Sequence, residues 1–232
     1  MSGKLASRKQ AYPLDMSRDE TVSRINVLER IRRAGTRGFL LLLLVLVAPT
    51  GYAGGLDHTV NPTNSGIWAR QYTNGLEYAV VATELGGALW LGGESELGRT
   101  FWQTVDSSIF SSATAQGLKW AFGRERPSQT SNPNEWFKGG QSFPSGEVTL
   151  QASFVTPFIV NYANRDPWVW ALEILPAYDA VARVKQGSHW QTDVIAGWAL
   201  GTGFGYLAAK NKSPFFLTVL PHTFMVGFHS NW

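Results

Sequence analysis

The 232-residue sequence contains no cysteine, and only 16% of its residues are charged. The lack of cysteine excludes disulfide bonds and thiolate chemistry. The sequence also lacks internal repeats, low-complexity blocks and any cluster of metal ligands. Aromatic residues, by contrast, are plentiful, with 10 Trp, 13 Phe and 7 Tyr. A chain of this length and composition can bury a sizeable core, and one domain is the expected organisation.

The formal charge of +3 is unevenly distributed along the chain. Residues 1–53 contain nine Lys or Arg and four acidic residues, whereas the remainder has 11 basic and 13 acidic residues. The basic isoelectric point therefore comes from the leader alone. Nucleic-acid binding, which needs a basic face on the folded domain, is not predicted.

The basic leader runs into one short apolar stretch, Phe39–Ala48. It has about half of the roughly 20 residues that a membrane-spanning helix needs. Together with the small residues Gly51 and Ala53, this pattern predicts a secretory signal peptide over residues 1–53, cleaved near Ala53. The protein is then expected in the periplasm or cell envelope. An uncleaved N-terminal membrane anchor is the alternative, and Met16 is a second candidate start.

Helical spacing dominates residues 54–213, where we expect the main domain, after a linker at 54–65. Small and apolar residues recur with this spacing at 76–91, 105–122, 147–162, 168–184 and 193–209. Pro157 and Pro176 should kink two of these helices. The last helix is apolar and dotted with glycine. We interpret it as the buried central helix of a bundle, with a membrane span as the alternative.

The final segment, residues 214–232, changes to the alternating pattern of a β-strand. Every second residue there is large and apolar, as in Phe224, Val226 and Phe228, and a turn is expected at Pro221. A lone hairpin is marginally stable, so we expect it to pack on the helical domain. The predicted fold class is all-α, a compact helical bundle with a small C-terminal β-hairpin.

Three short segments carry the side chains of chemical interest. They are KWAFGRERP (119–127), FPSGE (143–147) and ARVKQGSHWQTD (182–193). Taken singly, each has an ordinary explanation. The cations of the first, such as Arg124, could be solvated charges at a helix C-terminus. Pro-Ser-Gly is a common turn, and His189 and Asp193 lie four residues apart, a spacing typical of structural hydrogen bonds on one helix face.

Taken together, the order and spacing of these segments resemble the signature of the type 2 phosphatidic acid phosphatase superfamily, which also includes bacterial acid phosphatases and vanadium haloperoxidases. Its pattern is KxxxxxxRP, then PSGH, then SRxxxxxHxxxD. The matching residues, about the central third of the chain, are Lys119, Arg126, Pro127, Pro144, Ser145, Gly146, Arg183, His189 and Asp193. Two positions depart from the pattern, because Glu147 replaces the His of PSGH and Ala182 replaces the Ser before Arg183.

The resemblance implies a metal-independent phosphatase that needs no cofactor. His189 would be the nucleophile, forming a phosphohistidine, and Asp193 would accept a hydrogen bond from its other ring nitrogen. The phosphate would be bound by Lys119, Arg126, Ser145, Gly146 and Arg183. Guanidinium groups match phosphate oxygens bidentately, and backbone N–H groups at a helix start favour anions.

Glu147 stands where the family has its general acid. A carboxyl group with an ordinary pKa of about 4.3 is ionised at neutral pH. Next to a phosphate dianion, and partly desolvated, its pKa should rise, so we predict that Glu147 donates the proton to the leaving oxygen. The alternative is a carboxylate that merely suits the helix N-terminus.

The expected substrate is a phosphomonoester or pyrophosphate, lipid-linked or small and soluble. The ten Trp residues suit contact with a membrane surface, and core packing is the alternative use of most of them. The mean hydropathy of −0.10 is low for a polytopic membrane enzyme. Two other functions remain open. One is a catalytically silent protein that binds phosphate headgroups, and the other is a vanadium-dependent haloperoxidase.

Overall fold

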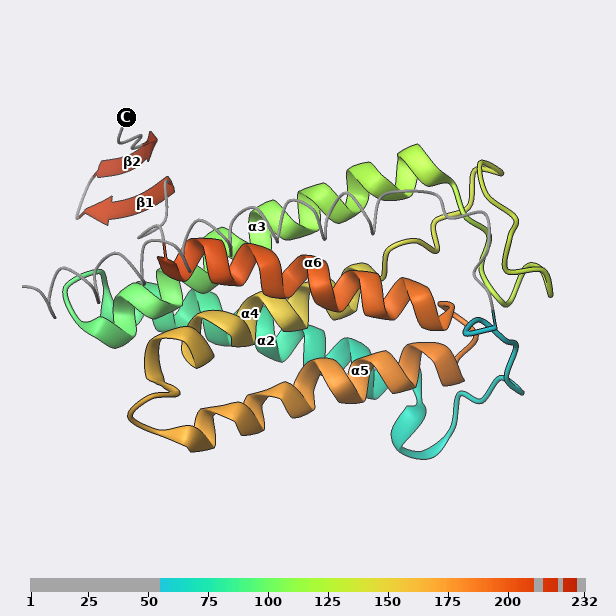
Figure 1. Ribbon diagram of the computed structural model, residues 1–232. Helices are drawn as coiled ribbons and strands as arrows, with labels where there is room; N and C mark the ends of the chain where they lie inside the picture. The colour runs from blue at the N-terminus through green and yellow to red at the C-terminus, as the bar shows by residue number, and fades with distance from the viewer. Residues whose placement is uncertain (1–54, 211–214, 221–222, 229–232) are drawn as a thin grey trace, which may run out of the picture. The chain divides into compact units, whose positions relative to one another are not determined.

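A computed structural model describes residues 55–210, 215–220 and 223–228 (Figure 1). Its five α-helices are α2 (Arg70–Leu91), α3 (Glu96–Phe122), α4 (Gly146–Tyr162), α5 (Ile174–Lys185) and α6 (Gln191–Lys210). Two 3-10 helices, η1 (Gly66–Trp68) and η2 (Pro167–Glu173), precede α2 and α5. The prediction of an all-α domain is confirmed. In the part of the chain that the structure describes, no helix is both long enough and apolar enough to cross a membrane.

Local sequence signals explain where two helices begin. The helix α3 starts nine residues before the predicted boundary of 105, because Ser95 caps it by accepting a hydrogen bond from the Gly98 N–H at 3.0 Å. The predicted helix at 168–184 is divided into η2 and α5. Pro176 has no N–H to donate to a carbonyl four residues earlier, so an α-helix cannot run unbroken through it. It lies instead in the first turn of α5, where this hydrogen bond is not needed.

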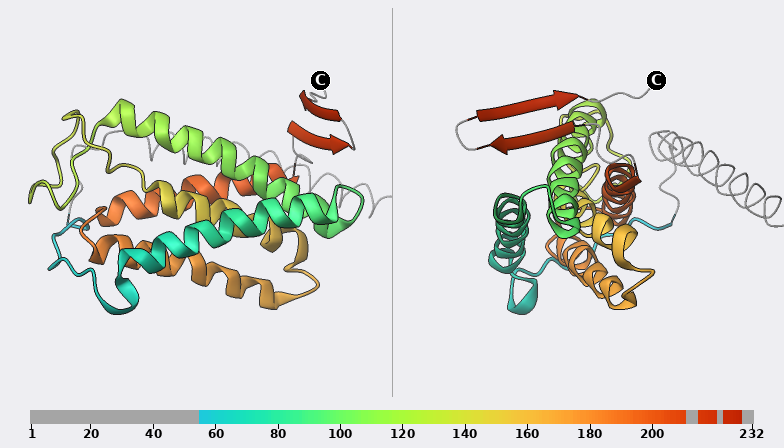
Figure 2. Two further views of the ribbon diagram at one scale, coloured as in Figure 1. Left: turned by 180° about the vertical axis from the view of Figure 1, so that it is seen from behind. Right: turned by 90° about the vertical axis from the view of Figure 1, so that its left-hand side faces the viewer.

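The helix α4 is the centre of the bundle, in which α2 to α6 run side by side (Figure 2). Every residue from Val148 to Pro157 is buried. Phe154, Val155 and Ile159 form one apolar cluster with Val80 of α2. Nearer the start of α4, Val148 packs with Ala180 and Val194, which come from α5 and α6. A helix buried on all faces needs no amphipathic pattern, since each side contacts another helix.

Three glycines of α6 bring its backbone against α4. A Cβ added at Gly197 would lie 2.4 Å from the Ser145 carbonyl oxygen, and one at Gly201 would lie 2.2 Å from that of Thr149. Gly205 faces Thr156 in the same way, with 2.6 Å to its Cβ. The spacing of four residues places these glycines on one face. The glycine-dotted segment is therefore a packed helix of the bundle, and its glycines permit close approach to α4. The prediction that it is the buried central helix is wrong, because α4 is central and α6 exposes Ile195 and Tyr206.

Two short strands follow α6. β1 (Phe215–Leu220) pairs antiparallel with β2 (Thr223–Phe228), and Phe215 lies opposite Phe228. Packing of this hairpin on the helical domain stays a prediction. The predicted leader, residues 1–53, and its cleavage site lie outside the described residues.

Candidate functional site

The predicted site residues lie where several helix ends meet. Lys119 is in the last turn of α3, Gly146 opens α4, Arg183 is in the last turn of α5 and Asp193 is in the first turn of α6. His189 lies in the loop between α5 and α6. These ends are on the same side of the bundle in Figure 1. Helix packing thus brings together segments separated by as much as 70 residues.

Glu147 lies between the predicted nucleophile and one predicted phosphate ligand. Its Oε1 is 3.3 Å from Nη1 of Arg183, and its Oε2 is 3.2 Å from Nε2 of His189. The Ser145 hydroxyl donates to the same Oε2 at 3.4 Å. The side chains of Arg183 and His189 are buried, whereas that of Glu147 is 25% exposed. We call the space between Arg183 and His189 at the start of α4 the anion site, and a carboxylate occupies it.

The electrostatics of the anion site keep Glu147 ionised. Burial of the carboxyl opposes ionisation, but the hydrogen bond and charge of His189 and the charge of Arg183 outweigh it and hold the pKa of Glu147 well below its ordinary value. Without substrate, Glu147 therefore lacks the proton that a general acid donates. It can act as the acid only after a phosphate takes its place at Arg183 and His189, and this role stays a prediction.

The imidazole of His189 is oriented by a backbone carbonyl. Its Nδ1 donates to the Ser142 carbonyl oxygen at 2.7 Å and lies 3.7 Å from Oδ2 of Asp193. Because a carbonyl oxygen only accepts, Nδ1 carries a proton. Nε2 also carries one while it donates to Oε2 of Glu147, and its lone pair is free only after that proton leaves. The structure differs here from the prediction that Asp193 accepts this hydrogen bond. Asp193 acts on the imidazole through its charge, from just beyond hydrogen-bond distance.

Asp193 is instead fully engaged by a buried network. Its Oδ2 accepts from the Ser142 hydroxyl at 2.5 Å and from the Trp190 N–H at 2.8 Å, and its Oδ1 binds Arg124 at 2.6 Å. Burial raises the pKa of Asp193, but these partners and His189 reverse the effect and lower it. The carboxylate thus ties the Ser142 hydroxyl and the Trp190 N–H, on either side of the His189 imidazole, to the start of α6.

Arg124 supplies the positive charge that the Asp193 carboxylate binds in this network. It is fully buried, so its interpretation as a solvated charge is wrong. Its guanidinium binds Asp57 and Asp193, each at 2.6 Å, and lies 4.4 Å from the centre of the Trp136 ring. Asp57 also accepts from the N–H and the hydroxyl of Thr192. The segment expected as a linker therefore contributes a buried carboxylate that supports the site.

The other two predicted cations lie along the loop before α4. Nζ of Lys119 donates to the carbonyl oxygens of Gln141 at 3.0 Å and Pro144 at 2.8 Å. Burial lowers the pKa of Lys119 to about 8. Nη2 of Arg126 donates to the same Gln141 oxygen at 3.4 Å. Lys119, in the last turn of α3, and Arg126, in the loop after it, thus share the Gln141 carbonyl oxygen as an acceptor.

Ser145 and Gly146 form the start of α4. The Ser145 N–H donates to the Asp193 carbonyl oxygen at 3.0 Å, so this N–H is already used. Gly146 follows, and an added Cβ there would lie 3.6 Å from Cε of Lys119. The N–H groups of the first turn of α4 have no helical acceptor and favour an anion. Of the two predicted backbone donors, only the one at Gly146 belongs to this first turn.

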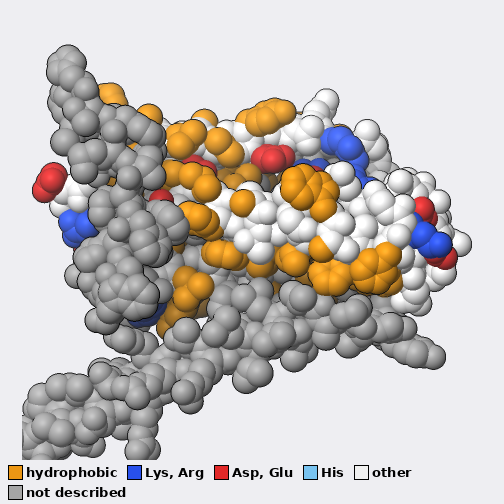
Figure 3. Space-filling view, turned by 90° about the horizontal axis from the view of Figure 1, so that it is seen from above, with side chains coloured by type: hydrophobic (Ala, Val, Ile, Leu, Met, Phe, Trp, Pro, Cys, Tyr) orange, Lys and Arg blue, Asp and Glu red, His pale blue; other side chains and the backbone are white. Residues whose placement is uncertain are grey.

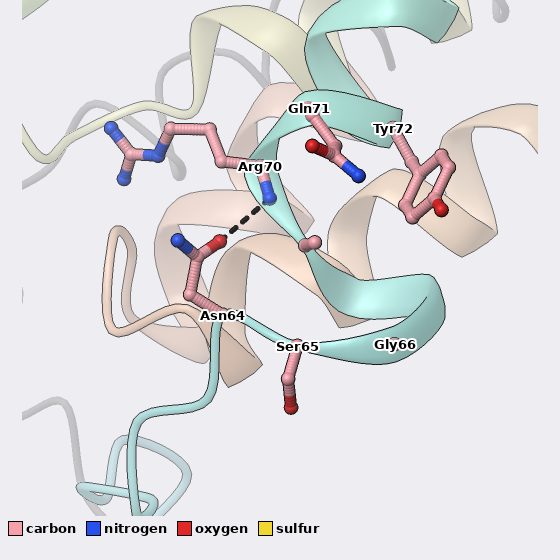
Figure 4. A pocket seen from close by; sticks show the side chains of 7 residues that line it. Asn64, Ser65, Gly66, Arg70, Gln71 and Tyr72 are labelled. Atoms are coloured by element: carbon pink, nitrogen blue, oxygen red, sulfur yellow. Dashed lines mark hydrogen bonds between the residues drawn. The ribbon is translucent and has the colours of Figure 1, made fainter.

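A separate pocket of about 410 Å³ lies on the outer side of the first turn of α2 (Figure 4). Its lining residues are Asn64, Ser65, Gly66, Ala69, Arg70, Gln71 and Tyr72. The Arg70 N–H donates to Oδ1 of Asn64 at 2.7 Å, and Nη2 of Arg70 donates to the Ser188 hydroxyl at 2.8 Å. None of the predicted site residues lines this pocket. Arg70 does, however, contact the residue that precedes His189.

Residues 101–215, half of the chain, match the PAP2 superfamily. A lipid A 1-phosphatase of Porphyromonas gingivalis is 31% identical over 90 residues, which are 38% of this chain and 18% of that protein. An undecaprenyl-diphosphatase of Sulfolobus acidocaldarius is 27% identical over 113 residues, 47% of this chain and 53% of that protein.

A third relative is a lipid A 1-phosphatase of Rhizobium johnstonii, 32% identical over 108 residues, which are 44% of this chain and 43% of that protein. The chain thus spans between 18% and 53% of the length of these relatives. No solved structure matches the chain significantly.

Proposed function

Because the chain belongs to the PAP2 superfamily, we propose that it is a phosphoric ester hydrolase that acts on a lipid-linked phosphate. The observation that carries the proposal is the anion site itself. It places a buried imidazole and a buried guanidinium on either side of a bound carboxylate, at 3.2 and 3.3 Å. A phosphoryl oxygen has the charge and the acceptor geometry to replace that carboxylate.

In the proposed reaction, the substrate phosphate displaces Glu147 and binds Arg183, Lys119 and the start of α4. The lone pair of Nε2 of His189 attacks phosphorus, and the bond from phosphorus to the leaving oxygen breaks. As Glu147 is displaced, its carboxylate takes the Nε2 proton of His189, which frees the lone pair for attack, and it then gives that proton to the leaving oxygen. Water then hydrolyses the phosphohistidine and returns a proton to the carboxylate. The Ser142 carbonyl keeps the proton on Nδ1 throughout and so orients the attacking nitrogen.

The proposed substrate class rests on two further observations. The relatives named above are phosphatases of lipid A and of undecaprenyl diphosphate. Large apolar side chains are also exposed, among them Trp90, Trp120 and Trp168 at 89%, 73% and 84%, and Figure 3 shows apolar side chains spread over one face of the molecule. Tryptophan is favoured where a protein meets a lipid headgroup layer. We propose that the protein is exported and meets its substrate at such a surface.

A second candidate function is a silent headgroup-binding protein. It is favoured by the ionised Glu147, because a carboxylate that never takes up a proton cannot protonate a poor leaving group. Both functions require phosphate binding at Arg183. Only the hydrolase requires turnover at His189.

The experiment is an assay of phosphate release from lipid A, undecaprenyl diphosphate, phosphatidic acid and soluble phosphomonoesters. The hydrolase predicts release from at least one lipid substrate, inhibition by vanadate, and an acid-labile phosphoryl label on the protein. His189→Ala should lose both turnover and label. Binding of these lipids without release by the wild type would select the silent binder, and a label that survives in His189→Ala would refute the nucleophile.

A further inference from the structure

Three carboxyl groups surround the guanidinium of Arg183. Oε1 of Glu147 lies 3.3 Å from Nη1, Oδ1 of Asp179 lies 3.2 Å from Nε, and Oε2 of Glu77 lies 4.0 Å from Nη2. One guanidinium balances the charge of one carboxylate. If all three were ionised, they would more than cancel the charge of Arg183, and this side of the anion site would repel a phosphate dianion.

The nitrogen Nη2 of Arg183 is the donor that remains available. It is buried and has no hydrogen-bond partner among the residues that the structure describes. At 4.0 Å the Glu77 carboxyl is too distant to accept from it. Buried guanidinium N–H groups are rarely left unpaired, because the lost hydrogen bond to water costs free energy. Nη2 therefore points to an anionic ligand, and an oxygen bound to it would lie beside Glu77.

The surroundings of Glu77 favour its protonated form. Burial and the Glu147 carboxylate raise the pKa of Glu77, and Arg183 opposes them without reversing the effect. The charged groups that act on this region are Arg183 and Asp179 on α5 and Glu147 on α4. Burial also raises the pKa of Asp179, to about 6. The Glu77 side chain is 34% exposed, so it can exchange a proton with water directly.

We propose that Glu77 is a substrate-binding residue that takes up one proton as phosphate binds and then donates a hydrogen bond to the phosphoryl oxygen held by Nη2 of Arg183. The inference rests on the proposed phosphate site but does not require turnover. An ionised Glu77 would repel the same oxygen, so the site binds phosphate together with a proton. Glu77 lies on α2, outside the residues 101–215 that match the PAP2 superfamily. No motif of the sequence marks it.

The test is calorimetric titration of the full chain with sulfate, which remains a dianion over the working pH range. Titration at pH 7 in two buffers of different ionisation enthalpy measures the number of protons taken up. Glu77→Gln should take up about one proton fewer per sulfate than the wild type. It should also bind sulfate more tightly at pH 8, because the amide N–H donates without first acquiring a proton. Glu77→Ala should show the same reduced uptake but weaker binding than Glu77→Gln.

Two variants serve as controls. The carboxyl of Glu173 also has a pKa raised by burial, but it accepts from the Trp198 ring N–H and has no contact with Arg183. Glu173→Gln should therefore keep the proton uptake of the wild type. Arg183→Gln should bind no sulfate.

The outcomes separate the inference from the proposed function. Equal proton uptake in the wild type and Glu77→Gln would overturn the inference. Uptake that is lost in Glu147→Gln but kept in Glu77→Gln would also overturn it, and would assign the proton to Glu147. A wild type that binds neither sulfate nor phosphate would refute the phosphate site itself.

Discussion

Replacing Arg124 by methionine should strongly destabilise the fold, because it leaves two buried carboxylates without a counter-ion. Asp57 and Asp193 each lie 2.6 Å from the guanidinium, and all three side chains have 0% exposure. Removing one partner of a buried ion pair costs about 3–5 kcal/mol. With a urea m-value of about 2 kcal/mol/M, that loss lowers the unfolding midpoint by about 2 M.

The assay is urea unfolding followed by tryptophan fluorescence, and the chain supplies a matched control. Arg165 and Glu96 form an ion pair of the same length, 2.6 Å, but their side chains are 58% and 49% exposed. Arg165→Met should leave the midpoint unchanged within error, because water solvates the remaining charge. Equal midpoints for Arg124→Met and the wild type would refute the reasoning that burial makes the Arg124 pairs indispensable.

The pH dependence of this effect has a defined sign. In the folded protein, the partners of Asp193 lower the pKa of this carboxyl. The ionised carboxylate therefore stabilises the fold above the unfolded pKa of about 3.9, and this stabilisation is lost as the pH falls through the lower folded pKa. In Arg124→Met the same carboxyl lacks its main cation and gains a proton more readily. The difference in free energy of unfolding between variant and wild type should therefore shrink as the pH is lowered toward 4.

Three further predictions concern the site. Because the pKa of Lys119 is lowered to about 8, its charge is lost as the pH rises through 8, and the kcat/KM of the wild type should fall over that range. Lys119→Met should have a lower kcat/KM than the wild type below pH 8 and should not show this fall. Glu147→Gln should slow alkyl phosphates far more than p-nitrophenyl phosphate, whose leaving group needs little protonation, and equal losses would refute a proton donor. Gly197→Ala should cost about 1–3 kcal/mol in urea unfolding, since its Cβ would lie 2.4 Å from the Ser145 carbonyl oxygen. Gly117→Ala, with open space around the added Cβ, should instead be neutral or stabilising, so equal losses in the two glycine variants would refute the close contact.

Local patterns explain why much of the helical architecture could be predicted. Helical spacing located the five helices, and the glycines of α6 pointed to a packed helix. The boundaries of α3 and α5 were less accurate, because they depend on the cap at Ser95 and on the missing N–H of Pro176. Both signals are present in the sequence. Whether a helix actually begins at such a residue also depends on the helices that pack against it.

The sequence by itself determined which residues are available for phosphate chemistry, because Lys119, Arg183 and His189 stand in the order and spacing of the phosphatase signature that the chain resembles. Only the tertiary structure decided their partners. It assigned Asp193 to Arg124, 69 residues away, and the imidazole of His189 to the Ser142 carbonyl, 47 residues away. The physical reason is that a buried charge takes the nearest good partner, and nearness across helices is set by packing, which no local spacing encodes.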